Sequence, residues 1–226
     1  MITKLNSYIL TDRVKDAMRN KLYKTQQEEL GFTLCSKSDN IIMPGRDLIG
    51  DSRKIEIDPG ACKEDEKFLG GYHTHHETDS RASAEDLYHC GKFKIICTGG
   101  KTDNKIRCHT WKYEQLSSED IGKMTDIVKK GVTNFESLKY QQSFNCFDTM
   151  EPLYSREKNV KENMDKKIYD IKSFLSILKK SGATESATRV QNMLTIATKA
   201  RNIYANKLVE EIKNESKKYY NEVEIK

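Results

Sequence analysis

Apolar positions near the start of the chain follow first a helical and then an extended pattern. Val14, Met18 and Leu22 recur at every fourth position, which predicts an amphipathic helix over residues 11–27. A strand is expected directly after it, over residues 28–35, where an apolar run follows two glutamates. The chain therefore opens as a mixed helix and strand unit.

Short apolar runs separated by glycine and proline continue to about residue 116. Ser83 followed by Asp86 predicts the capped start of a short helix that ends near Gly91. Glycine and proline, Pro44 and Gly45 among them, mark the turns between the runs. The runs that we expect to be strands are residues 40–43, 54–57, 68–73, 92–98 and 105–112.

Beyond residue 116 the apolar spacing becomes helical. Ser117 or Ser118 caps a first helix, and Pro152 is expected to break the chain before two longer helices that turn at Gly182. The spacing of four and three along both longer helices predicts an antiparallel hairpin. The two apolar seams are Met164, Ile168, Ile171, Leu175 and Leu178, and then Met193, Ala197, Ala200, Tyr204, Leu208 and Ile212.

These patterns predict an α/β fold class, with a mixed β-sheet flanked by helices and a long C-terminal helical hairpin. The expected parts are a domain over residues 1–116, a helical connector over 117–150 and the hairpin over 151–226. The apolar stripes of the hairpin face either each other and the first domain, or a partner. The second choice would make the hairpin a homodimer seam or a partner-binding arm.

Composition agrees with a compact domain that carries exposed helices. Of 226 residues, 36% are hydrophobic and 32% are charged, and the net charge of +5 is spread along the chain rather than gathered in a basic block. We therefore expect no nucleic-acid partner. No run of about 18 apolar residues is present, so we expect no membrane span and a cytoplasmic protein.

The six cysteines are scattered, without a CxxC pair. Cys35 and Cys97 lie in apolar runs and are expected to be small core residues. In a cytosolic protein these residues would be reduced thiols, and structural disulfides are not expected.

The pattern H-x-H-x7-S-x-x-D is the most informative feature for chemistry. Residues i and i+2 of a strand point to the same side, so His73 and His75 can present two imidazoles to one ion. Asp86, in the first turn of the following helix, can supply a third ligand. Two imidazoles and a carboxylate suit Zn²⁺, and three protein ligands leave the fourth position open for water, as hydrolysis requires.

This pattern resembles the JAMM (MPN-plus) motif of the JAB1/MPN/Mov34 metallopeptidases. Glu28 matches the family's E-x-x-G strand, and Gly70 and Tyr72 match its lead into the first histidine. The resemblance implies an MPN-type fold, zinc held by His73, His75 and Asp86, Glu28 as general base for the zinc-bound water, and Ser83 as oxyanion stabiliser. It also implies a protein substrate, such as a ubiquitin-like conjugate cleaved at an amide or isopeptide bond.

Three departures and one ambiguity accompany the resemblance. His76 replaces the family's usual proline, the second glycine of the glutamate strand is absent, and the connection from Ser83 to Trp111 is too short for the insertion of deubiquitinating members. Glu29 competes with Glu28, because adjacent residues of a strand face opposite sides and only one can reach the metal.

Three other functions remain as alternatives. The first alternative is a non-catalytic scaffold of the same fold, and the second is a module whose hairpin recruits a partner. A metal-dependent barrel hydrolase is the third alternative, but it needs more ligands than the remaining histidines offer and typically about 250 residues.

Overall fold

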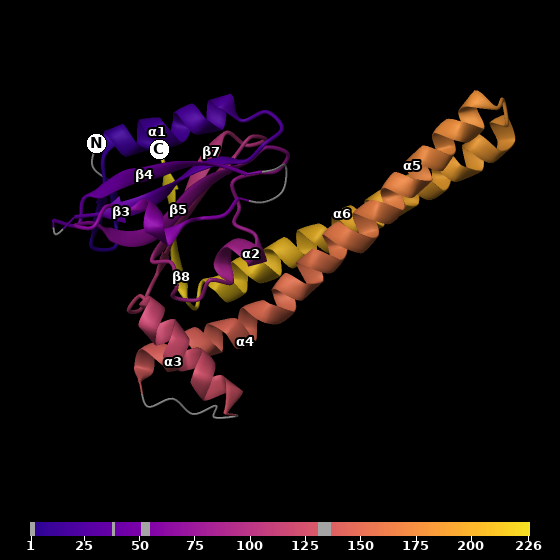
Figure 1. The fold of residues 1–226 in the computed structure, drawn as a ribbon. Coiled ribbons are helices and arrows are strands. Elements are labelled where there is room, and N and C mark those ends of the chain that lie inside the picture. Colours follow the sequence, from indigo (N-terminus) through magenta and orange to yellow (C-terminus); the bar gives the residue numbers. More distant parts are fainter. Residues whose placement is uncertain (1–2, 38, 51–54, 131–136) are drawn as a thin grey trace.

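A six-stranded mixed sheet forms the body of the protein, in the order β4-β3-β5-β6-β7-β8 (Figure 1). The computed structural model describes residues 3–37, 39–50, 55–130 and 137–226. β5 pairs with β6 in parallel, and every other neighbouring pair is antiparallel. The strands are β3 (Leu30–Ser36), β4 (Ile42–Ile49), β5 (Lys67–His75), β6 (Ile95–Gly100), β7 (Lys105–Trp111) and β8 (Tyr220–Ile225). The predicted α/β class with a mixed sheet is confirmed.

Helix α1 (Asp12–Lys24) covers one face of the sheet (Figure 1). Val14, Met18 and Leu22 are buried against the sheet, as the sequence predicts. Tyr72 of β5 donates a hydrogen bond from its Oη to the backbone oxygen of Met18 at 2.8 Å, which fastens the helix to the strand. The small hairpin of β1 (Thr3–Leu5) and β2 (Tyr8–Leu10) precedes α1 and has no counterpart in the sequence analysis.

The opposite face of the sheet packs against helices that come from later in the chain. The one-turn helix α2 (Ala84–Leu87) lies there with parts of α4 (Leu138–Asn159) and α6 (Thr184–Ser216), around the fully buried Trp111. A short 3-10 helix, Pro59–Ala61, precedes β5, and α3 (Ser118–Lys129) follows β7.

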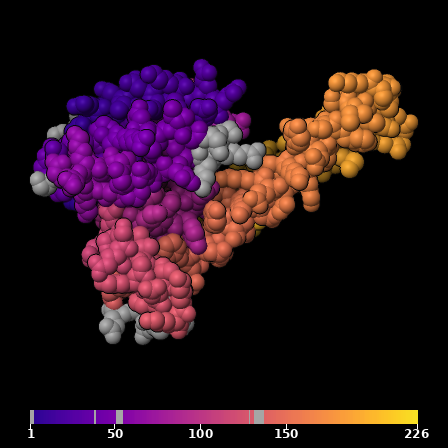
Figure 2. All heavy atoms as spheres, viewed as in Figure 1, coloured from indigo at the N-terminus to yellow at the C-terminus, as the bar shows by residue number. Residues whose placement is uncertain are grey.

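A long helical arm projects from the body (Figures 1 and 2). It consists of α4, a π-helical segment (Val160–Met164), α5 (Asp165–Lys180) and the returning helix α6. The predicted antiparallel hairpin is confirmed, with its turn at Gly182, where φ is +74°. No helix among the described residues is both long and apolar enough to cross a membrane.

Only the first of the two predicted seams packs within the hairpin, where Leu175 is buried and Ile168, Ile171 and Leu178 are partly buried. The seam on α5 packs against Ala187, Val190 and Leu194 of α6. Met193, Ala200 and Tyr204 of the predicted α6 seam are exposed, whereas Leu208 and Ile212 are buried against the body. Two apolar stripes run along α6, and contacts across the hairpin rather than spacing decide which of them is covered.

The two predicted breaks at proline are wrong. Helix α4 passes through Pro152, because the burial of Met150 and Leu153 on either side offsets the lost hydrogen bond. Strand β4 passes through Pro44 and so replaces the predicted strand at 40–43. β4 is the edge strand of the sheet, where a residue without an N–H costs no ladder hydrogen bond.

Two further differences concern strands. Residues 55–57 of the predicted strand 54–57 form no strand, and Lys54 lies outside the described residues. Strand β8 lies within the range expected to be hairpin, and it pairs with β7 from Ile106↔Ile225 to Trp111↔Tyr220. Strand β8 is short and follows directly on a long helix. No glycine or proline marks a turn between them, so the sequence gives no sign that the helix ends.

The prediction of reduced cysteines is wrong, because all six pair in disulfides. Cys35 is bonded to Cys62 and Cys90 to Cys146, with Cα atoms 5.7 and 5.6 Å apart. Cys97 and Cys108 lie directly opposite each other on β6 and β7 and form the third disulfide. The cysteines look isolated in the sequence because their partners are 11 to 56 residues away.

The disulfides can be tested by counting thiols. In denaturant without reductant, the protein is expected to show no thiol that reacts with Ellman's reagent, and after reduction it should show all six. Alkylation and mass spectrometry of the non-reduced protein would assign the three pairs. Six reactive thiols before reduction would contradict the pairing.

Candidate metal centre

A bulge in β5 decides which side of the sheet carries the two histidines. The register between β3 and β5 shifts between Leu34↔Gly70 and Cys35↔Phe68, and Gly70 has φ of +139°. A side chain is excluded at Gly70, where a Cβ would lie 2.0 Å from the backbone oxygen of Ile95. Beyond the bulge Tyr72 faces α1. His73 and His75 therefore face the opposite side, toward α2.

Asp86 reaches the histidines from the third position of α2. His73 Nε2 lies 3.0 Å from Asp86 Oδ1, and His75 Nε2 lies 3.6 Å from Asp86 Oδ2. The two Nε2 atoms are 3.1 Å apart. One ligand atom from each residue lies within 4.8 Å of the others, so the structure brings the three predicted ligands together.

Asp86 and His75 stabilise the charged forms of each other. Burial raises the pKa of Asp86, but the facing imidazoles of His73 and His75 outweigh this and hold it well below its ordinary value. Burial lowers the pKa of His75, but the hydrogen bond to the Asp86 carboxylate outweighs this effect and raises the pKa to about 9. The carboxylate therefore keeps its charge in a buried place, and a divalent cation would take the position of the imidazolium proton.

The outer nitrogen of His75 is fixed by the backbone. His75 Nδ1 lies 3.0 Å from the backbone oxygen of Asp79, which can only accept, so Nδ1 carries a proton and Nε2 is the nitrogen that could bind a metal ion. Nδ1 of His73 is buried and has no hydrogen-bond partner among the described residues.

The cleft beside the histidines is lined by Glu29, whereas the general base expected from the sequence is Glu28. Gly31 of β3 is the register partner of His73, so two residues back Glu29 is level with His75 and on the same face. Glu28 is exposed and is not among the residues that line the cleft. Glu29 is 9% exposed and lies in the cleft beside both histidines. Burial raises the pKa of Glu29, while the two imidazoles lower it.

Ser83 is the N-cap of α2. Its Oγ accepts a hydrogen bond from Asp86 N at 3.1 Å and donates one to Asp86 Oδ2 at 2.7 Å, while Ser83 N donates to the same Oδ2. These bonds form a capping box that orients the Asp86 carboxylate. Ser83 lines the cleft, and its role as oxyanion stabiliser stays a prediction.

The helical arm forms the second wall of the cleft, a feature that the sequence analysis missed. The cleft has a volume of about 950 Å³ and is lined from the arm by residues that include Tyr154, Glu157 and Lys161. The side chain of Glu157 accepts a hydrogen bond from Ala84 N at 2.9 Å, at the start of α2. Lys161 belongs to the π-helical segment, a geometry that is frequent at functional sites. No spacing in the sequence links these residues to the motif.

The donor set fits zinc. Two imidazole nitrogens and one carboxylate are typical of catalytic sites, in which one position stays open. Cys90 is the nearest cysteine in sequence, but its bond to Cys146 removes it as a fourth ligand. His89 also lines the cleft, and burial lowers its pKa to about 4, so it is neutral beside the site.

Comparisons with known proteins add one likeness in structure. No protein-family model matches the sequence, and no curated protein matches it. The crystal structure of a JAB1/MPN domain protein from Archaeoglobus fulgidus aligns with 50% of this chain and 96% of its own length, with a TM-score of 0.34 and 16% sequence identity. A likeness of this degree assigns neither family nor activity, so the function is argued from the residues themselves.

Metal content tests the three ligands directly. Protein prepared without chelator is expected to contain about one zinc ion per chain. His73→Ala and Asp86→Ala should lose the ion, because two ligands do not hold zinc against buffer. His76→Ala is the matched control, since this histidine contacts Glu77 and is not one of the three predicted ligands. Native protein that takes up no zinc would favour the non-catalytic scaffold.

Proposed function

We propose that this protein is a zinc-dependent peptidase or isopeptidase that hydrolyses an amide bond of a protein substrate. The observation that carries the proposal is the position of Glu29, a buried carboxylate that shares one cleft with His73, His75 and Asp86. The three ligands leave a coordination position open, but they include no group that would take up a proton. Hydrolysis also requires a general base, and a carboxylate that lies beside the ligands without being one of them can serve as this base.

The residues divide the chemistry among them. Zinc, when bound, supplies a Lewis acid that polarises a carbonyl and lowers the pKa of water toward about 7. Glu29 takes the proton of the attacking water and returns it to the leaving amine. Burial raises the pKa of this carboxyl, which brings it closer to the neutral pH at which proton transfer in both directions is efficient. Ser83 donates its hydroxyl to the developing oxyanion.

The shape of the cleft supports an extended polypeptide substrate. One wall is the sheet face and the other is the arm, with apolar residues such as Ile57, Phe93 and Val160 interspersed among charged ones. The C-terminal tail of a ubiquitin-like modifier, the substrate class implied by the sequence resemblance, is a segment of this kind. Three disulfides persist under oxidising conditions, so the proposed setting is an oxidising compartment in place of the expected cytoplasm.

Two neighbouring glutamates provide a matched test of the mechanism. Glu29→Gln is expected to lower kcat for a ubiquitin-like fusion or a generic peptide by roughly 10²–10⁴-fold while zinc content is unchanged, because only the proton acceptor is lost. Glu28→Gln removes an exposed carboxylate one residue away and should retain native activity. Equal activity of Glu29→Gln and the native protein would reject the mechanism.

A second candidate function is self-association through the arm, which would make the arm a dimerisation module. Met193, Ile196, Ala200 and Ile203 of α6 are spaced three, four and three residues apart and are exposed, as in an unpaired coiled-coil seam. Met193, Ile196, Ile203, Tyr204 and Phe174 expose between 37% and 69% of their surface. At roughly 100 Å² each, two copies would bury about 1,000 Å², the lower limit for a specific interface.

Charge placed on this seam tests the association. The native protein is expected to be a dimer by light scattering at about 10 µM, and the double variant Ile196→Glu, Ile203→Glu should be a monomer. Thr195→Glu with Asn202→Glu adds the same charge next to the seam and should leave the dimer intact. A monomeric native protein would exclude this function.

A further inference from the structure

One peptide unit connects the metal ligand His75 to a carboxylate on another loop. The backbone oxygen of Asp79 contacts His75 Nδ1 at 3.0 Å. The N–H of the same peptide unit belongs to Ser80 and donates to Asp103 Oδ1 at 3.1 Å. We propose that Asp103 is a positioning residue for His75 and acts through the peptide between Asp79 and Ser80. The proposal rests on the metal centre described above.

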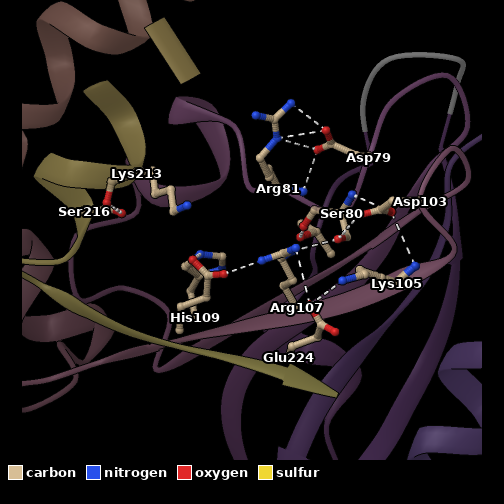
Figure 3. A network of polar contacts seen from close by, with 12 residues as sticks. Asp79, Ser80, Arg81, Asp103, Lys105, Arg107, His109, Lys213, Ser216 and Glu224 are labelled. Carbon is tan, nitrogen blue, oxygen red and sulfur yellow. Dashed lines mark hydrogen bonds and ion pairs between the residues drawn. The ribbon is translucent and has the colours of Figure 1, made fainter. Parts of the chain in front are cut away.

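Ser80 is held at every polar atom, as Figure 3 shows for its side chain and N–H. Its Oγ donates to Asp103 Oδ2 at 2.7 Å and accepts from Arg107 Nε at 2.9 Å. Its backbone oxygen accepts from Thr98 Oγ1 at 2.6 Å. Ser80 is completely buried. The peptide unit that precedes it is therefore fixed in orientation, and so is the carbonyl that faces His75.

The strands leave room for Asp103 to approach. A Cβ on Gly100 would lie 2.0 Å from Ser80 N and 2.4 Å from Asp103 Oδ1, so any side chain at this position would displace the contact. Asp103 also accepts from Lys105 N at 3.3 Å, which fixes it within the turn between β6 and β7. The glycine and the turn together hold the carboxylate against the Ser80 peptide.

The C-terminal strand holds the other side of Ser80. Glu222 of β8 accepts from Arg107 Nη1 at 2.7 Å. Glu224 lies 3.4 Å from Arg107 Nη2 (Figure 3). Arg107 is thereby directed toward Ser80 Oγ. The network extends from the sheet edge to the loop that carries the carbonyl of Asp79.

The charge of Asp103 also has an electrostatic consequence. A carboxylate at the N–H end of a peptide polarises it, so the carbonyl oxygen at the other end becomes a stronger acceptor. A stronger acceptor at Nδ1 makes the imidazole of His75 a better ligand through Nε2, as direct carboxylate partners do in zinc sites. Here a peptide unit stands between the carboxylate and the imidazole.

A second Ser–Asp pair in this chain provides the control. Asp120 accepts from both N and Oγ of Ser117 at 2.9 Å, at the start of α3, as Asp103 does from Ser80. Both carboxylates lose the same type of contact when they are changed to Asn. Only Asp103 is connected to a ligand.

The experiment measures metal affinity, not turnover. Asp103→Asn is expected to weaken zinc binding by roughly 10–100-fold, measured against a chromophoric chelator, and to shift the visible absorption of the Co²⁺-loaded protein. Asp120→Asn should leave both unchanged. A purely structural role of Asp103 would lower the melting temperature of both variants without changing affinity, and this result would overturn the proposal.

A second measurement needs no variant. In the zinc-loaded native protein, NMR should show a protected Nδ1–H signal for His75, and its absence would overturn the proposal even if Asp103→Asn did not fold. Failure of the proposed function is distinguishable: native protein that binds neither Zn²⁺ nor Co²⁺ removes the metal centre as a whole. Normal binding by Asp103→Asn removes only this inference.

Discussion

Because β5 changes its facing at Gly70, the sheet presents an apolar surface to α1 and a reactive one to α2. Without the bulge, the alternation of side chains that buries Leu69 would send Tyr72 toward α2 and both histidines into the core under α1. The register of β3 then decides which of two glutamates joins them. Three protein segments meet at the site: the backbone of β5 sets the facing of the histidines and the pairing with β3 sets that of Glu29, while α2 supplies Asp86.

The local parts of the site could be predicted from the sequence, and the non-local parts could not. The shared facing of His73 and His75 follows from the alternation of side chains in a strand. The position of Asp86 follows from its place three residues after the helix cap Ser83. The choice between Glu28 and Glu29 depended on the pairing of β3 with β5, which no spacing within β3 contains. The E-x-x-G resemblance selects Glu28, whereas the residue that lines the cleft is Glu29.

The same distinction applies to the fold. Helix α1 and the turn at Gly182 were predictable because their signals are local. The exposed seam on α6 and the continuation of α4 through Pro152 depend on what packs against each helix. The disulfides depend on cysteines that meet only when the sheet and α4 are in place.

Glu157 joins the arm to the candidate metal centre. Its side chain accepts a hydrogen bond from Ala84 N, so the arm places a carboxyl group at the start of the helix that carries Asp86. Burial raises the pKa of this carboxyl group. The arm and the site are therefore parts of one structure. Helix α2 has only one turn, and a side chain of the arm pairs with one of its free N–H groups.

The pairing of Trp111 with Tyr220 means that everything between them, residues 112–219, is an excursion from a single β-hairpin. The two residues that bracket the excursion are ladder neighbours, and Lys112 N donates to the backbone oxygen of Tyr219 at 2.9 Å. The outer part of such an excursion can lengthen or shorten by whole helical turns without any change in strand register. The length of the outer arm and the chemistry of the sheet are thus free to vary separately in this architecture.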